Sequence, residues 1–205
     1  MVKNNKNVIQ KSMGWSLFSE IAAKFVTPIT NMILARILMP EAFGVLAICN
    51  MFVSFVDIIT DAGFGKYLVQ HDFKNEKEKR SYADVAFWSN LTLSIILFVI
   101  ILLNRSAISR LLGNSDYSTV ISVASIQLIF TSLSSIQKGL FRRQFDFKKL
   151  FMTRLAVAIT PLIVAVPLAF ILRSYWALIF GNLAGAFINA FILTAMSSWK
   201  PQFFY

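Results

Sequence analysis

The chain has few of the residues that enzymes and metal proteins use for chemistry. Among its 205 residues there are one cysteine, Cys49, and one histidine, His71. A single cysteine excludes an internal disulfide, and we expect Cys49 to be a small buried apolar residue. One histidine in a charged loop supplies too little for a metal centre or a Ser–His triad. We therefore expect no metal, no cofactor and no enzymatic activity.

Acidic residues are half as numerous as basic ones. Ten Asp and Glu stand against twenty Lys and Arg, which gives a net charge of +10. A basic patch is the usual sign of nucleic-acid binding. Here the cations cluster at the ends of apolar runs, where they fix membrane topology and contact lipid head groups. We expect membrane lipids, and no nucleic acid, as partners.

Apolar residues are abundant. They make up 57% of the chain, and the mean hydropathy is +0.65, whereas a soluble domain has about 45 to 50%. A bilayer core of roughly 30 Å needs about 20 apolar residues per helix, and the runs are continuous, without the alternation of barrel strands. The sequence predicts an all-α polytopic membrane protein with a leader at 1–12, a six-helix transmembrane bundle at 13–198, a tail at 199–205, and spans at about 13–38, 43–60, 82–103, 118–137, 151–172 and 176–197.

Lysine and arginine are unevenly divided between the two predicted membrane faces. Fifteen lie on one side, in the leader, the second and fourth breaks between spans, the start of the fifth span (Arg154) and the tail, whereas the other side has Arg105, Arg110 and Arg173. Because cytoplasmic loops carry the excess of positive residues, both termini are predicted to be cytoplasmic. An even number of spans agrees with this orientation.

Polar side chains follow one face of each of the first two predicted spans. Spacings of four, three and four residues place each set on one helical stripe. If the spans run antiparallel from a turn at Pro40, every member of one stripe has a partner at similar depth in the other. The stripes are Glu20, Lys24, Thr27 and Asn31 in span one, and Asn50, Ser54, Asp57 and Asp61 in span two.

These stripes have two interpretations. A Lys24 pair with Asp57 or Glu20 can simply hold the hairpin together. Alternatively, because a charge at the bilayer centre costs about 2.5 to 3.5 kcal/mol and usually marks a pathway, the stripes line a hydrated cavity. Lys24 would then attract an anionic substrate group, with Asn31 and Asn50 beside it. Carboxylates would bind a cation or relay protons, and the ion-coupling candidates are Glu20, Asp57 and Asp61.

Two later segments carry further patterns. Gly181 and Gly185 form a G-x-x-x-G ridge in the last span, which predicts close helix packing. Residues 140–149 interleave aromatic and basic side chains, which is typical of a helix lying in the membrane interface. Such a helix would anchor the chain or capture a lipid that carries a pyrophosphate.

Several short motifs resemble those of a known family. They are LARILMPEAFG at Leu34 to Gly44, DAGFG at Asp61 to Gly65, LVQ at Leu68 to Gln70, and the basic stretch from Phe141 to Phe147. Together they resemble the start of flippases in the polysaccharide transporter branch of the multidrug/oligosaccharidyl-lipid/polysaccharide (MOP) exporter superfamily.

This resemblance implies a flippase of the bacterial inner membrane. It would carry undecaprenyl-diphosphate-linked oligosaccharide from the inner to the outer leaflet by alternating access, for O-antigen, capsule or exopolysaccharide assembly. Lys24 becomes a candidate contact for the diphosphate, with Arg36 as a second. Because Arg36 lies about 160° around the helix from Glu20, it can instead snorkel outward.

The resemblance also implies that the chain is equivalent to one lobe of a MATE-like fold. Relatives are built from two six-helix lobes around a central cavity, and this sequence matches the amino-terminal one. A second lobe or a homodimer would then complete the pore, or the chain is a truncated or split product. The alternative function is a non-transporting membrane subunit that scaffolds glycan-assembly enzymes through the Gly181 ridge and the basic loops.

Overall fold

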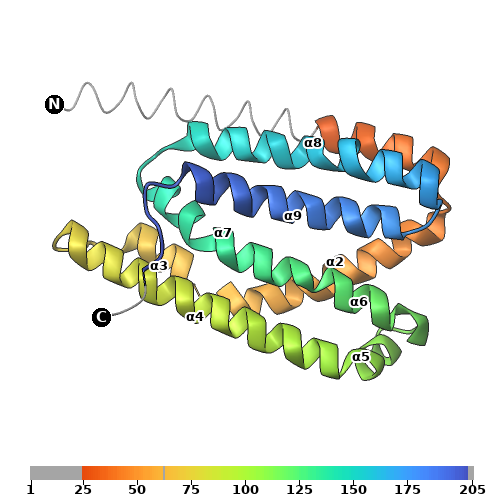
Figure 1. The fold of residues 1–205 in the computed structure, drawn as a ribbon, viewed down its shortest axis with the longest axis horizontal. Helices are drawn as coiled ribbons and strands as arrows, with labels where there is room; N and C mark the ends of the chain where they lie inside the picture. The colour runs from red at the N-terminus through yellow and green to blue at the C-terminus, as the bar shows by residue number, and fades with distance from the viewer. Residues whose placement is uncertain (1–24, 62, 203–205) are drawn as a thin grey trace.

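All regular structure in the described part of the chain is helical. The computed structural model describes residues 25–61 and 63–202, and Figure 1 shows their arrangement. The elements in chain order are a helix at Phe25–Ile37, α2 (Pro40–Asp61), α3 (Phe64–Gln70), α4 (Glu76–Leu103), α5 (Arg105–Leu111), the 3-10 turn η1 (Ser115–Tyr117), α6 (Ser118–Ala124), α7 (Ile126–Arg143), α8 (Phe147–Leu172) and α9 (Trp176–Met196).

Five stretches of helix are long and apolar enough to cross a membrane, among the residues that the structure describes. They confirm the prediction of an all-α, multi-pass membrane protein. The first predicted span is described only from Phe25 onward, as a shorter apolar helix. The stretches are Pro40–Thr60, Glu76–Leu103, Ser115–Arg143, Phe147–Leu172 and Trp176–Met196.

The fourth predicted span is divided into two helices. α6 ends at Ala124 and α7 begins at Ile126, so Ser125 stands at the junction. The Ser125 hydroxyl donates to the carbonyl oxygen of Ile121 at 2.6 Å. A serine that bonds back to the preceding turn competes with the helical ladder and bends the helix. Ser125 therefore marks the point at which the predicted span is interrupted.

The long helices lie side by side along the bundle, and α2 crosses them obliquely (Figure 1). The backbones of α8 and α9 lie close together at Gly181. A Cβ built on Gly181 would lie 2.6 Å from the Cβ of Ala165, whereas one on Gly185 would lie 3.8 Å from Val157 Cγ1. A small residue lets two helices approach in a membrane, where packing replaces the hydrophobic driving force.

The buried core is narrow and the outside is apolar. Cys49, Ile121 and Leu128 are at most 1% exposed in the core around α2, α6 and α7. By contrast, Phe55 is 65% exposed and Ile163 is 66% exposed. An apolar exterior over helices of membrane-crossing length is what a lipid-facing surface requires.

The predicted interfacial helix at residues 140–149 is absent from the described structure, and that prediction was wrong. Arg142 belongs to the last turn of α7, and Lys149 to the start of α8. The turn between them is closed by a hydrogen bond from the Asp146 amide to the Phe141 carbonyl at 3.0 Å. Asp146 then caps α8 by accepting from the Lys149 amide. With so short a connection, the aromatic and basic residues extend two transmembrane helices instead.

Candidate functional site

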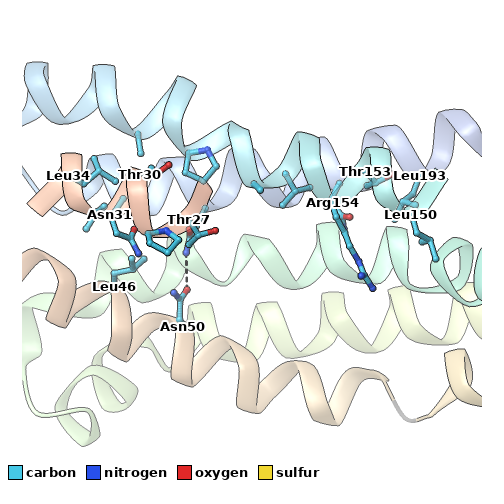
Figure 2. A pocket seen from close by; sticks show the side chains of 18 of the residues that line it. Thr27, Thr30, Asn31, Leu34, Leu46, Asn50, Leu150, Thr153, Arg154 and Leu193 are labelled. Carbon is cyan, nitrogen blue, oxygen red and sulfur yellow. Dashed lines mark hydrogen bonds between the residues drawn. The ribbon is translucent and has the colours of Figure 1, made fainter. Parts of the chain in front are cut away.

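A large cavity opens between the Phe25–Ile37 helix and helices α2, α7, α8 and α9 (Figure 2). Its volume is about 930 Å³. Apolar side chains such as Leu34 and Leu193 form part of the wall. The polar side chains that line it are Thr27, Thr30, Asn31, Asn50, Lys138, Arg142, Thr153, Arg154, Asn182 and Asn189.

One end of this cavity is rich in neutral amides. Figure 2 shows Thr27, Asn31 and Asn50 gathered there, away from Arg154. The Asn182 amide of α9 donates to Asn50 Oδ1 of α2 at 3.0 Å. Farther along α9, the Asn189 amide donates to Ser134 Oγ of α7 at 3.1 Å. These interhelical hydrogen bonds fix amide groups at the wall of a cavity inside the membrane-spanning bundle.

The other end of the cavity is basic. Lys138 and Arg142 are four residues apart on α7, so their side chains share one helical face. Arg154 joins them from α8, where its side chain reaches into the space between the helices (Figure 2). An adjoining pocket of about 520 Å³ shares Arg142 and Arg154, and is also lined by Arg143 and Asp72. Positive charge is therefore concentrated where the cavity meets the end of the bundle.

The structure brings together some of the residues predicted for the site and separates others. Asn31 and Asn50 line the same cavity. Arg36 is exposed and is not among the described residues that line it. Asp57 instead lines a small polar cavity between α2, α4 and α7. Thr27, from the same predicted stripe as Asn31, lines the cavity too. The other two members of that stripe, Glu20 and Lys24, lie outside the described residues, as does the side chain of Asp61 at the end of the second stripe.

The oblique course of α2 explains this separation (Figure 1). Asn50 and Asp57 lie on one face of a single helix, two turns apart. Because α2 crosses the bundle, that face meets α9 at Asn50, and it meets α4 and α7 at Asp57. Periodicity defines the face of a helix but does not reveal which neighbour the face meets.

Arg154, Thr153 and Asn182 were not identified as site residues from the sequence. A signal was available, because Arg154 and Asn182 are isolated polar residues inside predicted spans, and such residues usually face a bundle interior. Lys138 entered the sequence analysis only as one of the basic residues in the fourth break. Their convergence depends on how α7, α8 and α9 pack.

Comparisons with known proteins agree on one family. A family model described as polysaccharide biosynthesis protein matches residues 33–205. The succinoglycan biosynthesis transport protein ExoT of Rhizobium meliloti (strain 1021) is 25% identical over 201 residues, which are 97% of this chain and 40% of the relative. The lipopolysaccharide biosynthesis protein WzxC of Escherichia coli (strain K12) is 20% identical over 182 residues, 89% of this chain and 35% of the relative.

A third relative is called an uncharacterized membrane protein in the cps region of Klebsiella pneumoniae. It is 24% identical over 184 residues, 90% of this chain and 37% of the relative. The chain thus spans about two fifths of the length of the curated relatives that it matches. No solved structure matches it.

Proposed function

The chain belongs to the polysaccharide biosynthesis protein family, and from this premise we propose that it takes part in exporting polysaccharide precursors across the bacterial inner membrane. The observation that carries the proposal is a cavity of about 930 Å³, inside a membrane bundle, with a basic end and an amide-rich end. The similarity to a relative named as a succinoglycan biosynthesis transport protein also supports a role in transport.

The substrate that fits this polarity is an oligosaccharide linked to a lipid through a diphosphate. Lys138, Arg142 and Arg154 supply cationic donors, and Arg in particular matches phosphate oxygens with two parallel hydrogen bonds. Asn31 and Asn182 offer the amide donors and acceptors that sugar hydroxyls can pair with. Apolar stretches of the wall suit the lipid.

The cavity would form half of a transport pathway. Rocking of two repeats around a shared site is the usual route to alternating access, and it needs both repeats. Because the chain spans about two fifths of its relatives, we propose that a second six-helix lobe, in the same or another polypeptide, faces this cavity. A second copy of this chain is the other arrangement that supplies two lobes.

The basic end would face the cytoplasm. The positive-inside rule places the breaks that contain Lys66, Lys74 and Lys148 on the inner side. α3, the start of α4, the end of α7 and the start of α8 all lie at that end of the bundle (Figure 1). A diphosphate head group arriving in the inner leaflet would meet Arg142 and Arg154 first.

Lys24 and Arg36 take different places in this proposal. Lys24 precedes Asn31 by two helical turns on the predicted stripe, so it stays a candidate for the diphosphate, although it lies outside the described residues. Arg36 is exposed beyond the described cavity lining. We therefore assign the main phosphate contact to the basic end of the cavity.

Binding of a diphosphate lipid tests the proposal. The purified chain in lipid nanodiscs should bind undecaprenyl diphosphate, and Arg154→Ala should weaken binding about tenfold or more, because a charge-assisted hydrogen bond contributes about 1.5 to 3 kcal/mol. Arg105→Ala is the matched control, since it removes an equal charge from an exposed residue of α5. Equal losses in the two variants, or no binding by the unaltered chain, would contradict the assignment.

Export in cells separates transport from scaffolding. In the native host, Arg154→Ala should reduce surface polysaccharide while the protein remains at its normal level in the membrane. A scaffold, which needs no phosphate contact in the cavity, would tolerate this substitution. Normal export in the Arg154→Ala strain would therefore favour the scaffold.

A further inference from the structure

A proline in the wall of the large cavity changes what the backbone offers there. Pro161 lies in the middle of α8 and lines the cavity together with Val157 and Ala158. Proline has no amide N–H, so the carbonyl of the residue four positions earlier loses its helical donor. That carbonyl belongs to Val157. α8 therefore presents one backbone acceptor that lacks its usual partner in the helix.

The Val157 carbonyl oxygen lies toward α9, next to a glycine. A Cβ built on Gly185 would lie 3.9 Å from this oxygen, and of the described residues outside α9 only Val157 comes within 4 Å of that point. The glycine therefore leaves the oxygen uncovered by a side chain. The Thr160 hydroxyl is used elsewhere, because it donates to the Ala156 carbonyl at 2.8 Å. Backbone groups without a partner are tolerated at membrane depth where they line a water-filled cavity.

Two amide side chains flank the same point on α9. Asn182 precedes Gly185 by three residues and Asn189 follows it by four, so all three share one face of the helix. Both asparagines line the cavity. Each uses one amide hydrogen in an interhelical bond, and the amide nitrogen carries a second. The wall therefore places a backbone acceptor between two amide donors, about 4.5 and 6 Å from them along the helix axis.

We propose that this wall binds a sugar hydroxyl, which donates its proton to the Val157 carbonyl and accepts from the amide of Asn182 or Asn189. A hydroxyl group is both a donor and an acceptor, so it needs such a pair. The inference rests on the proposed function. Arg154 lines the same cavity one helical turn before Val157, so a diphosphate held there would bring its first sugar to this wall. Pro161 is a positioning residue, because it acts through the carbonyl.

A comparison of two lipids tests the inference on the purified chain in nanodiscs. The probes are undecaprenyl diphosphate and the undecaprenyl-diphosphate-linked oligosaccharide extracted from the native host. Pro161→Ala restores an amide donor to Val157. It should weaken binding of the glycosylated lipid about three- to tenfold, as expected for one neutral hydrogen bond, and leave binding of the sugar-free lipid unchanged. The melting temperature should not fall, because alanine favours the helix interior.

Pro167→Ala is the matched control. It restores the same kind of hydrogen bond in α8, but Pro167 is exposed and is not among the described residues that line the cavity. Both lipids should therefore bind normally to this variant. Gly185→Ala provides a second test if Pro161→Ala fails to fold. Its methyl group would cover the Val157 oxygen in ordinary van der Waals contact, and it should cause the same selective loss.

The outcomes separate this inference from the proposed function. The inference is overturned if Pro161→Ala or Gly185→Ala binds the glycosylated lipid as tightly as the unaltered chain, or if Pro167→Ala loses binding equally. It is also overturned if the unaltered chain binds both lipids equally well, or if the variants lose both lipids together, as a purely structural role would require. In these cases binding of the diphosphate still stands. If the unaltered chain binds neither lipid, the proposed function fails and this inference with it.

Discussion

At the scale of single residues, Arg143 shows how one side chain can hold α3 and α7 together at one end of the bundle. Its Nη1 donates to the carbonyl oxygens of Leu68 at 3.0 Å, Val69 at 3.4 Å and His71 at 2.5 Å. Its guanidinium also lies 4.9 Å from the centre of the Phe73 ring. The final carbonyls of a helix have no partner within the helix, so Arg143 supplies the donor that the end of α3 needs.

Arg143→Ala should therefore destabilise the protein. We expect a loss of about 2 kcal/mol, because hydrogen bonds to a charged group contribute about 1.5 to 3 kcal/mol, and a fall of about 4 °C or more in the melting temperature of the detergent-solubilised chain. Arg142→Ala is the control, since it removes an equal charge from the neighbouring exposed position. An equal fall in both variants would show that lost charge, rather than the cap on α3, is responsible.

At the scale of elements, the packing of α8 against α9 depends more on Gly181 than on Gly185. The Gly181 and Gly185 ridge predicts close packing for both. The structure shows that the two positions differ. Gly181 lies directly against the Ala165 side chain, whereas Gly185 has room for a methyl group. Ala165 is 1% exposed, and its Cβ is fixed to the backbone of α8. It cannot move aside unless the whole helix shifts.

Gly181→Ala should accordingly destabilise the bundle, and Gly185→Ala should not. Overpacking a well-filled interface costs about 1 to 3 kcal/mol, whereas a methyl group in ordinary van der Waals contact at position 185 costs little. Thermal unfolding of both variants in the same detergent makes the comparison. If Gly181→Ala melts like the unaltered chain, α8 and α9 approach less closely than the structure indicates.

At the scale of the whole molecule, the chain is a helical membrane bundle of the polysaccharide biosynthesis family. The resemblance based on LARILMPEAFG and DAGFG is confirmed by the family match over residues 33–205. The basic residues at one end of the bundle predict its orientation in the membrane. The proposed export of glycan precursors depends on that orientation, because the cationic end of the large cavity would have to open toward the leaflet where a diphosphate lipid arrives.

Cysteine labelling tests the orientation without altering the native cysteine. Cys49 is 1% exposed, so the unaltered chain should give little background with a membrane-impermeant maleimide. In intact spheroplasts, Ser115→Cys in η1 should be labelled, whereas Lys74→Cys, between α3 and α4, should be labelled only after lysis. Both replaced residues are exposed. The reverse pattern would place the basic end outside and overturn the proposed direction of transport.

The sequence by itself determined the membrane class, the helical architecture and the family. Hydrocarbon leaves few ways to satisfy the backbone, so a continuous apolar run of sufficient length becomes a helix. Helical periodicity also placed Asn50 and Asp57 on one face of α2. These properties depend on neighbours along the chain, which are visible in the sequence.

Only the tertiary structure decided which polar residues share a cavity. Asn50 meets Asn182, more than a hundred residues away along the chain, and Asp57 shares its cavity with Asn90 and Ser135. Arg154 joins Lys138 because a short turn brings α8 back beside α7. The crossing angle of α2 sets the associations of Asn50 and Asp57. That angle arises from side-chain packing between helices, which the spacing of residues along a single helix does not specify.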